Sequence, residues 1–147
     1  MLSEYLLERR NKMYHKKTKK GKEDDGLWEI FSQYIRLRDA DENGICTCFT
    51  CGRKTIWNKN TDCGHGVPRQ HKATKYNEKN NHAQCKTCNG FQGGMREVYK
   101  ERMDLKYGEG TWDKMIVASR LRVKLDIELM KEHYKDLVKQ IKEQYNL

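Results

Sequence analysis

Two cysteine pairs have the spacing of a metal site. Cys48-x-x-Cys51 and Cys85-x-x-Cys88 are separated by 33 residues. A two-residue gap lets one tight turn offer two thiolates to the same ion, and Zn²⁺ prefers four such ligands in a tetrahedron. Disulfides or a redox pair are the alternatives, but neither pair lies in the βαβ pattern of thioredoxin-like proteins. We therefore predict a structural zinc site.

The segment between and just after the cysteine pairs carries side chains suited to phosphodiester hydrolysis. Such a reaction needs a base to activate water, a hard divalent ion to hold the phosphate, and a group that orients the base. His65 supplies an imidazole that titrates near neutral pH, and Asn89 offers a carbonyl oxygen suited to Mg²⁺ at the start of an expected helix. Asn80 or Asn81 is expected to hold the loop so that His65 points at the water. Arg69 is expected to bind a phosphate through two nitrogens.

Several of these side chains also have a plainer interpretation. The glycines on both sides of His65 would expose it, and an exposed loop histidine needs no catalytic role. Asp62 is equally consistent with a metal ligand and with a surface carboxylate. His71 and His82 lie nearby and are expected to be structural histidines, with contact to phosphate or metal as the alternative. Cys46 and Cys63 are expected to be small residues outside the zinc site.

Positive charge is concentrated in two segments of this chain of 147 residues, whose net charge is +9. Residues 1–22 hold eight Lys and Arg against two Glu, and residues 52–79 hold seven against two acids. Clustered cations bind phosphate with an affinity that depends on salt. A solvated tail that keeps the protein soluble is the alternative for the first segment. The cations that we expect to contact DNA are Arg9, Arg10, Lys16, Lys17, Lys19, Lys20, Lys72 and Lys75.

The apolar content excludes a membrane span. No apolar run is longer than Met115-Ile-Val-Ala118, whereas a spanning helix needs about 20 apolar residues. The first residues lack the apolar region of a secretory signal, so we expect a cytoplasmic protein with no membrane partner. Six cysteines in that compartment favour metal over disulfides.

Helical periodicity flanks an irregular, cysteine-rich unit over residues 45–94. Helices are expected over residues 2–13, 27–40, 91–107 with a stop at Gly108, and within 112–145 after a cap at Thr111. We predict three units, namely a basic arm (1–26), a zinc-bound nuclease domain (27–108) and a C-terminal helical region (109–147).

The C-terminal region carries a seam of apolar residues with alternating spacings of three and four, as in a coiled coil. Its members are Ile127, Met130, Tyr134, Leu137 and Ile141. The seam has two interpretations: it packs on the chain's own core, or it joins two copies in a homodimer.

The motifs together resemble the phage NinG (Rap) recombination protein family. The resemblance covers about residues 27–108 and rests on Gly64-His65, Arg69, and Asn80-x-His82-Ala-Gln-Cys85-x-x-Cys88-Asn89. The resemblance implies an HNH, or ββα-metal, finger. The same motifs are also similar to those of recombination endonuclease VII. The implied fold is α+β and mostly helical, with a zinc-stabilised finger flanked by helices.

The resemblance also implies roles for the residues. His65 would be the general base, Asn80 the loop-orienting Asn, and Asn89 a ligand of a catalytic Mg²⁺ or Mn²⁺. Many such fingers place an Asp directly before the His, where this chain has Gly64. The carboxylate ligand is therefore open, with Asp62 as the candidate. The implied protein is encoded by a phage or prophage and works in the bacterial cytoplasm.

The implied activity is an endonuclease that cuts branched recombination DNA, such as Holliday junctions and D-loops. We expect a homodimer, because resolving a junction takes two paired cuts. Two other functions fit the sequence. One is an HNH nicking or restriction-type enzyme on duplex DNA. The other is a non-catalytic zinc-ribbon protein that only binds DNA.

Overall fold

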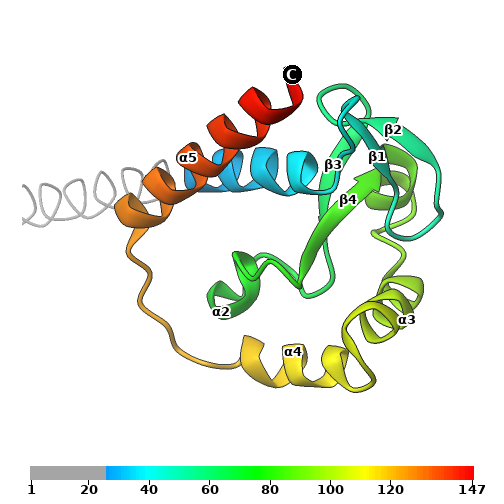
Figure 1. Cartoon of the computed structure of the whole chain (residues 1–147). Helices are drawn as coiled ribbons and strands as arrows, with labels where there is room; N and C mark the ends of the chain where they lie inside the picture. The colour runs from blue at the N-terminus through cyan, green and yellow to red at the C-terminus, as the bar shows by residue number, and fades with distance from the viewer. Residues whose placement is uncertain (1–25) are drawn as a thin grey trace, which may run out of the picture.

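The structure, a computed structural model, describes residues 26–147. Its first described element is a helix over residues 26–38. The others follow in the order β1 (Ile45–Thr47), β2 (Lys54–Ile56), β3 (Thr61–His65), α2 (Lys72–Lys75), β4 (Asn81–Cys85), the π-helical turn η1 (Thr87–Phe91), α3 (Arg96–Tyr107), α4 (Thr111–Ser119) and α5 (Ile127–Tyr145) (Figure 1). A mixed, largely helical fold is thereby confirmed. The helix expected over residues 2–13 and the cations of the N-terminal arm lie outside the described residues.

Two small antiparallel sheets carry the cysteines and His65. β1 pairs with β2, and β3 pairs with β4. The second register is continuous from Thr61 opposite Cys85 to His65 opposite Asn81, so β3 contains no bulge. Two-stranded sheets are marginal alone in water, and the flanking helices must therefore supply the core.

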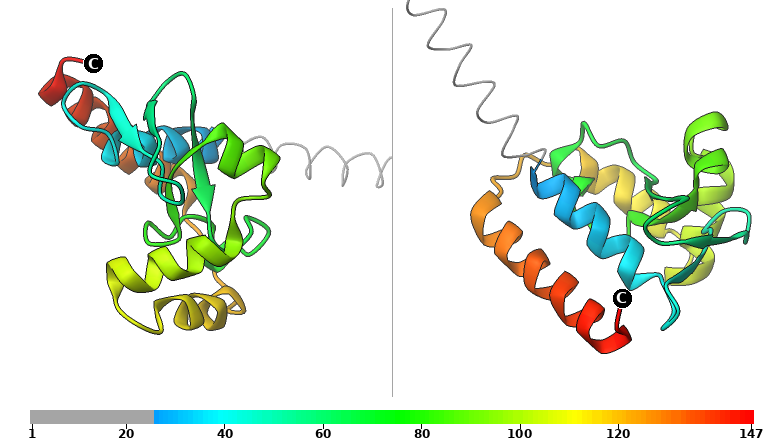
Figure 2. Two further views of the ribbon diagram at one scale, coloured as in Figure 1. Left: turned by 90° about the vertical axis from the view of Figure 1, so that its right-hand side faces the viewer. Right: turned by 90° about the horizontal axis from the view of Figure 1, so that it is seen from above.

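The 26–38 helix and α5 lie side by side along an aromatic core (Figure 2). The rings of Phe31 and Tyr134 are 4.9 Å apart in a T-shaped contact, and Tyr34 lies 5.1 Å from Tyr134. The remaining seam residues of α5 pack against the same core. The seam therefore serves the chain's own core, which was one of its two interpretations. A homodimer stays a prediction, and it would need another surface.

Residues at the end of the first helix tie it to β4. The Arg38 guanidinium pairs with Asp39 at 2.8 Å and donates to the Asn81 carbonyl at 2.8 Å. The Asp39 carboxylate accepts the backbone N–H of Ala83, also at 2.8 Å. These bonds fix the first helix against the sheet that carries His65.

The helix predicted over residues 91–107 begins later than expected. η1 ends at Phe91, and Gly93 and Gly94 then adopt φ values of 61° and 87°, which no helix contains. α3 begins at Arg96. The reason is local, because the chain must first turn around the second cysteine pair before a regular helix can start.

The C-terminal region consists of two helices, as predicted, with a different cap. Gly110, at φ 83°, is the N-cap of α4, and Thr111 is its first residue rather than its cap. The Thr111 hydroxyl donates to the Gly108 carbonyl at 2.7 Å. The Asp126 carboxylate caps α5 by accepting the Leu129 N–H at 3.1 Å. Among the described residues, no helix combines the length and the apolar character that a membrane span requires.

Candidate active site and zinc centre

The sulfur atoms of four cysteines from three parts of the fold lie close together. Cys48 and Cys51 flank the turn between β1 and β2, Cys85 ends β4, and Cys88 lies in η1. All four Sγ atoms lie within 4.8 Å of one another, and those of Cys51 and Cys85 are 3.8 Å apart. Zn–S bonds of about 2.3 Å place the corners of a tetrahedron about 3.8 Å apart. The donor set and its spacing therefore fit a structural Zn²⁺.

The four clustered thiols need a nearby cation if all of them are to be ionised. Burial raises the pKa of Cys48, but the amide of Cys51 and the hydroxyl of Thr50 outweigh burial and bring that pKa down to about 6. Burial, together with the neighbouring sulfurs, raises the pKa of Cys88 to about 12. Four sulfurs this close repel one another as thiolates unless a cation compensates them. Zn²⁺ would hold all four in the charged form.

Cys46 and Cys63 stand apart from the cluster, as predicted. Both are buried in the main core, and burial raises the pKa of Cys46 to about 11 and that of Cys63 to about 12. The Cys46 thiol donates to the Arg36 carbonyl at 3.1 Å. All six cysteines are free thiols, so the disulfide alternative has no support in the structure.

A polar cavity of about 300 Å³ brings the predicted site residues together. The side chains that line it are Trp28, Ser32, Asp62, Cys63, His65, Arg69 and Asn89. Four of them were candidates from the sequence, and they come from β3, η1 and the loop that follows β3. None of the four zinc ligands lines this cavity, so zinc and the candidate chemistry are separate.

Asp62 and Asn89 meet inside the cavity. The Asn89 amide donates to Asp62 Oδ2 at 3.1 Å. Asp62 belongs to β3, and Asn89 lies inside the short η1 turn. The sequence had predicted Asn89 at the start of a helix, and that position was wrong. The pair offers oxygen ligands of the kind that hard divalent cations take.

The space beside Gly64 explains why no acid precedes His65. A Cβ at Gly64 would lie 1.9 Å from Gln84 Oε1 and 2.6 Å from its Cδ. Gln84 is fully buried, and its amide donates to the Thr50 hydroxyl at 3.1 Å and to the Gly94 carbonyl at 3.0 Å. A carboxylate at position 64 therefore has no room, and Asp62 is the acid that β3 brings to the cavity.

The His65 imidazole is half-buried rather than exposed, in contrast to the expectation from its flanking glycines. A Cβ at Gly66 would lie 2.8 Å from the Trp112 ring, so this glycine serves close packing. Burial and, secondly, the charge of Arg69 lower the pKa of His65. Its Nδ1 is buried without a hydrogen-bond partner among the described residues. Such an atom is uncommon in native proteins.

Trp28 packs against the main core and also lines the cavity, although it was not among the candidates from the sequence. Its ring makes a T-shaped contact with His65 at 6.3 Å, and the Arg69 guanidinium lies over it at 4.6 Å. Trp28 and Ser32 are one helical turn apart, so they share the helix face that looks toward the cavity. The four-residue spacing of Trp28 and Ser32 was the feature of the sequence that could have placed both on the same side of the helix.

Asn80 and Asn81 both hold the loop that follows His65. Asn80 is fully buried; its Oδ1 accepts the Val67 N–H at 2.8 Å, and its amide donates to the Val67 and Thr74 carbonyls at 3.1 and 3.2 Å. The Asn81 amide donates to the Asn77 carbonyl at 2.7 Å. Neither side chain lines the cavity. Asn80 holds the backbone two residues before Arg69, whereas Asn81 holds the backbone that follows α2.

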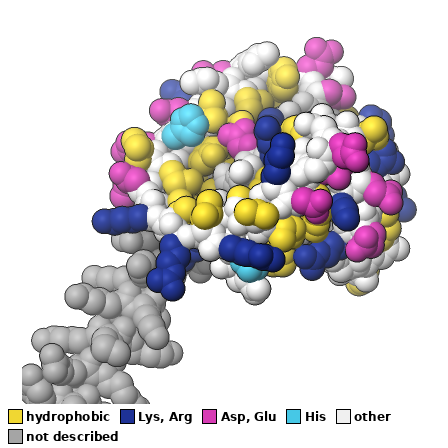
Figure 3. Space-filling view, turned by 90° about the horizontal axis from the view of Figure 1, so that it is seen from below, with side chains coloured by type: hydrophobic (Ala, Val, Ile, Leu, Met, Phe, Trp, Pro, Cys, Tyr) yellow, Lys and Arg dark blue, Asp and Glu magenta, His cyan; other side chains and the backbone are white. Residues whose placement is uncertain are grey.

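The other candidate residues lie elsewhere. His82 is buried, and its two ring nitrogens lie 3.0 Å from the Tyr99 hydroxyl and 2.7 Å from the Tyr107 hydroxyl, so it is structural as predicted. His71 is the N-cap residue of α2. Lys72 and Lys75 belong to α2 and do not line the cavity. Lys and Arg side chains are spread over the face seen from below, with apolar and acidic side chains between them (Figure 3).

The comparisons with known proteins give one match. A family model described as Bacteriophage Lambda NinG protein matches residues 4–146. No curated protein and no solved structure matches the chain. The matched range includes the cysteine cluster and every residue that lines the cavity.

Proposed function

The chain belongs to the bacteriophage lambda NinG protein family, and we propose that it is a metal-dependent DNA endonuclease that acts in phage recombination. One observation carries the proposal. A single cavity holds an imidazole with a lowered pKa, a carboxylate and amide in contact, and a guanidinium. These groups can serve as the base, as the ligands of a divalent cation and as a phosphate ligand in phosphodiester hydrolysis.

His65 is the general base in this proposal. Its lowered pKa keeps the ring neutral at pH 7, and a neutral imidazole has one nitrogen that can accept a proton. His65 takes a proton from water while the water oxygen forms a bond to phosphorus. The bond from phosphorus to the 3′ oxygen breaks, and that oxygen takes up a proton from solvent. The products are a 3′-hydroxyl and a 5′-phosphate.

Asp62 and Asn89 are suited to hold the catalytic cation. Ligand oxygens on adjacent corners of a magnesium octahedron, with bonds of about 2.1 Å, stand about 3.0 Å apart. The Asn89 amide nitrogen lies 3.1 Å from Asp62 Oδ2, and a half-turn of the amide would put its oxygen in that place. When bound, Mg²⁺ or Mn²⁺ would supply Lewis-acid stabilisation of the charge that develops on the phosphate and the leaving oxygen.

Arg69 binds the substrate phosphate in this proposal. Its guanidinium lies over Trp28, a contact that leaves its N–H groups in the plane of the guanidinium available for a phosphate. Asn80 holds the loop backbone near Arg69 and is a positioning residue.

The order of elements supports an HNH, or ββα-metal, finger. β3 and β4 form an antiparallel hairpin and the helical turn η1 follows, so His65 comes from the first strand and Asn89 from the helical part. The zinc cysteines at the end of β4 and in η1 fix the hairpin to the helical turn. Zinc in this proposal is structural and does not touch the substrate.

Branched recombination DNA is the proposed substrate, with linear duplex as the alternative. The test is a cleavage assay on a synthetic four-way junction and on a duplex of the same sequence, with Mg²⁺, Mn²⁺ or EDTA. We expect cation-dependent cuts in the junction and at least about tenfold slower cleavage of the duplex. Equal cleavage of both substrates would remove the branched-DNA specificity.

The matched variants are His65→Ala and His133→Ala, which removes an exposed histidine of α5. Loss of a general base costs about 10²–10⁴-fold in rate. His65→Ala should lose cleavage to that extent while it keeps DNA affinity and zinc content, and His133→Ala should cleave normally. If the unmodified protein binds DNA and zinc but cuts no substrate with any cation, the protein is a zinc-ribbon DNA-binding protein instead.

A further inference from the structure

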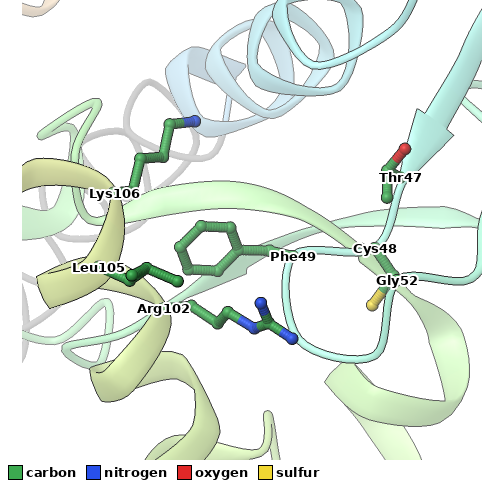
Figure 4. Close-up of a pocket in the computed structure, with 7 residues that line it drawn as sticks. All are labelled: Thr47, Cys48, Phe49, Gly52, Arg102, Leu105 and Lys106. Atoms are coloured by element: carbon green, nitrogen blue, oxygen red, sulfur yellow. The ribbon is translucent and has the colours of Figure 1, made fainter.

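A second groove lies between the first cysteine turn and α3. It has a volume of about 360 Å³, and its lining residues are Thr47, Cys48, Phe49, Gly52, Arg102, Leu105 and Lys106 (Figure 4). None of these lines the His65 cavity, so the groove is a separate surface. None of them is acidic. A groove of this volume is in the size range of small-ligand sites, about 300–1,000 Å³.

One wall of the groove is the aromatic ring of Phe49, which packs against a buried histidine. The Phe49 ring stacks on the His82 imidazole, with centroids 3.8 Å apart and planes at 6°. His82 is itself fixed by hydrogen bonds to Tyr99 and Tyr107. His82 thus covers one face of the Phe49 ring, while Phe49 also lines the open groove. A supported ring of this kind is a stacking platform that costs little ordering on binding.

Cations stand on both sides of this ring. Figure 4 shows Arg102 and Lys106 on either side of Phe49, each extending from α3. The Lys106 ammonium lies 6.0 Å from the centre of the Phe49 ring. Leu105, between them on α3, is 78% exposed, so the groove keeps an uncovered apolar side chain next to two cations.

We propose that this groove binds one unstacked nucleotide of a DNA strand, with its base against Phe49 and the phosphates on its two sides against Arg102 and Lys106. An aromatic ring flanked by cations fits a nucleotide, because every base has a π-face and every nucleotide a phosphate. The inference rests on the proposed function and deepens it. Branch points are where strands leave the duplex, and a second site on a separate surface would hold such a strand away from His65.

The test is a binding cycle that pairs a change in the DNA with a change in the protein. The probe is a labelled duplex with a two-nucleotide bulge, compared with the same duplex in which one bulged base is replaced by an abasic site. Binding is measured by fluorescence anisotropy with EDTA present, so that no cleavage occurs. Stacking of one base on an aromatic ring changes affinity by about fivefold or more. The unmodified protein should therefore bind the abasic probe at least about fivefold more weakly.

Two protein changes complete the cycle. Phe49→Leu removes the stacking ring, and Leu105→Glu places a carboxylate in the groove from an exposed helix position that tolerates it. Both variants should bind the two probes with nearly equal affinity. Thermal melting and zinc content show whether Phe49→Leu is folded, and Leu105→Glu keeps the test valid if it is not. Lys135→Glu, an exposed position of α5, is the matched control and should keep the full preference for the intact bulge.

The outcomes separate the groove from the proposed function. If the unmodified protein binds both probes equally, or if Leu105→Glu keeps the preference, the groove does not take a base and the inference is overturned, while the nuclease proposal stands. If the protein binds no DNA of any form, the proposed function fails as well.

Discussion

The zinc cluster and the His65 cavity are neighbours, since Cys88 belongs to the first and Asn89 lines the second, yet they are built in opposite ways. The cluster offers four sulfurs of one kind within 4.8 Å, and a single ion would satisfy all of them. The cavity combines five different polar side chains, and His65 Nδ1 has no hydrogen-bond partner among the described residues. Closed sites with four protein ligands are structural in known zinc proteins, whereas sites that do chemistry keep an open position.

The difference teaches which region is for stability and which is for reaction. The cluster joins three segments around a small sheet that has too few strands to be stable alone. The cavity is lined by polar groups, and one of them, His65 Nδ1, is buried without a partner among the described residues. Such burial lowers the stability of the folded protein unless a ligand completes the site. We expect changes in the cluster to act on folding and changes in the cavity to act on turnover.

Removal of one zinc ligand should have the largest effect of the changes that separate the two regions. In Cys85→Ser we expect loss of zinc and of the cooperative thermal transition, because apparent binding free energies of structural zinc are on the order of 10 kcal/mol. Zinc stoichiometry and thermal melting measure it. Cys63→Ala, which empties only a small core position, is the control and should keep its zinc. An unchanged zinc content in Cys85→Ser would show that the four sulfurs are not a metal site.

Gly64 tests the border between the two regions. Gly64→Ala should lower the free energy of unfolding by about 1–3 kcal/mol, as overpacking does, because its Cβ would overlap the fully buried Gln84 side chain. Urea unfolding measures this change. At Gly90 an added Cβ meets no atom within 4 Å, so Gly90→Ala is the control. A neutral Gly64→Ala would mean that Gln84 moves easily, and the steric reason for the missing acid would be wrong.

His82 contrasts with His65 because it is buried with both nitrogens bonded. Burial, with Arg38 and Lys106 secondarily, lowers the pKa of His82 to about 2. The unfolded chain takes up a proton near pH 6.5 that the folded chain does not, so stability is complete above that pH and falls below it. We expect a loss of about 1.4 kcal/mol per pH unit below 6.5.

The measurement compares unfolding of the unmodified protein and of His82→Gln between pH 5 and 7. The comparison cancels the contribution of the thiolates, which both proteins share. His82→Gln should show the shallower pH dependence, and identical slopes would mean that His82 titrates normally in the folded state.

The pH dependence of cleavage gives the smallest expected effect. Burial and the charge of Arg69 lower the pKa of His65, so the rate should rise with pH through a midpoint below 6.5. In Arg69→Gln the midpoint should move upward by less than about one pH unit, because burial, the larger cause, remains. A midpoint above 6.5 in the unmodified protein would contradict a base of this kind.

Local spacing was enough to predict the zinc cluster, the separate roles of Cys46 and Cys63, the first helix and the helical C-terminal region. Residue types also pointed to His65, Arg69, Asn80, Asn89 and Asp62. The predicted start of α3 was wrong, because the turn around the second cysteine pair requires positive φ angles at Gly93 and Gly94. Trp28 was not among the candidates, because its ring meets His65 only after the first helix docks on β3.

The sequence by itself determined which residues are near one another along the chain, and therefore the two cysteine turns and the apolar seam of α5. Only the tertiary structure decided that the seam covers the chain's own core, that Gln84 fills the place of an acid at position 64, and that Asp62 meets Asn89. The physical reason is that these are packing choices between distant segments. Several partners have suitable chemistry for each choice, and space is what selects among them.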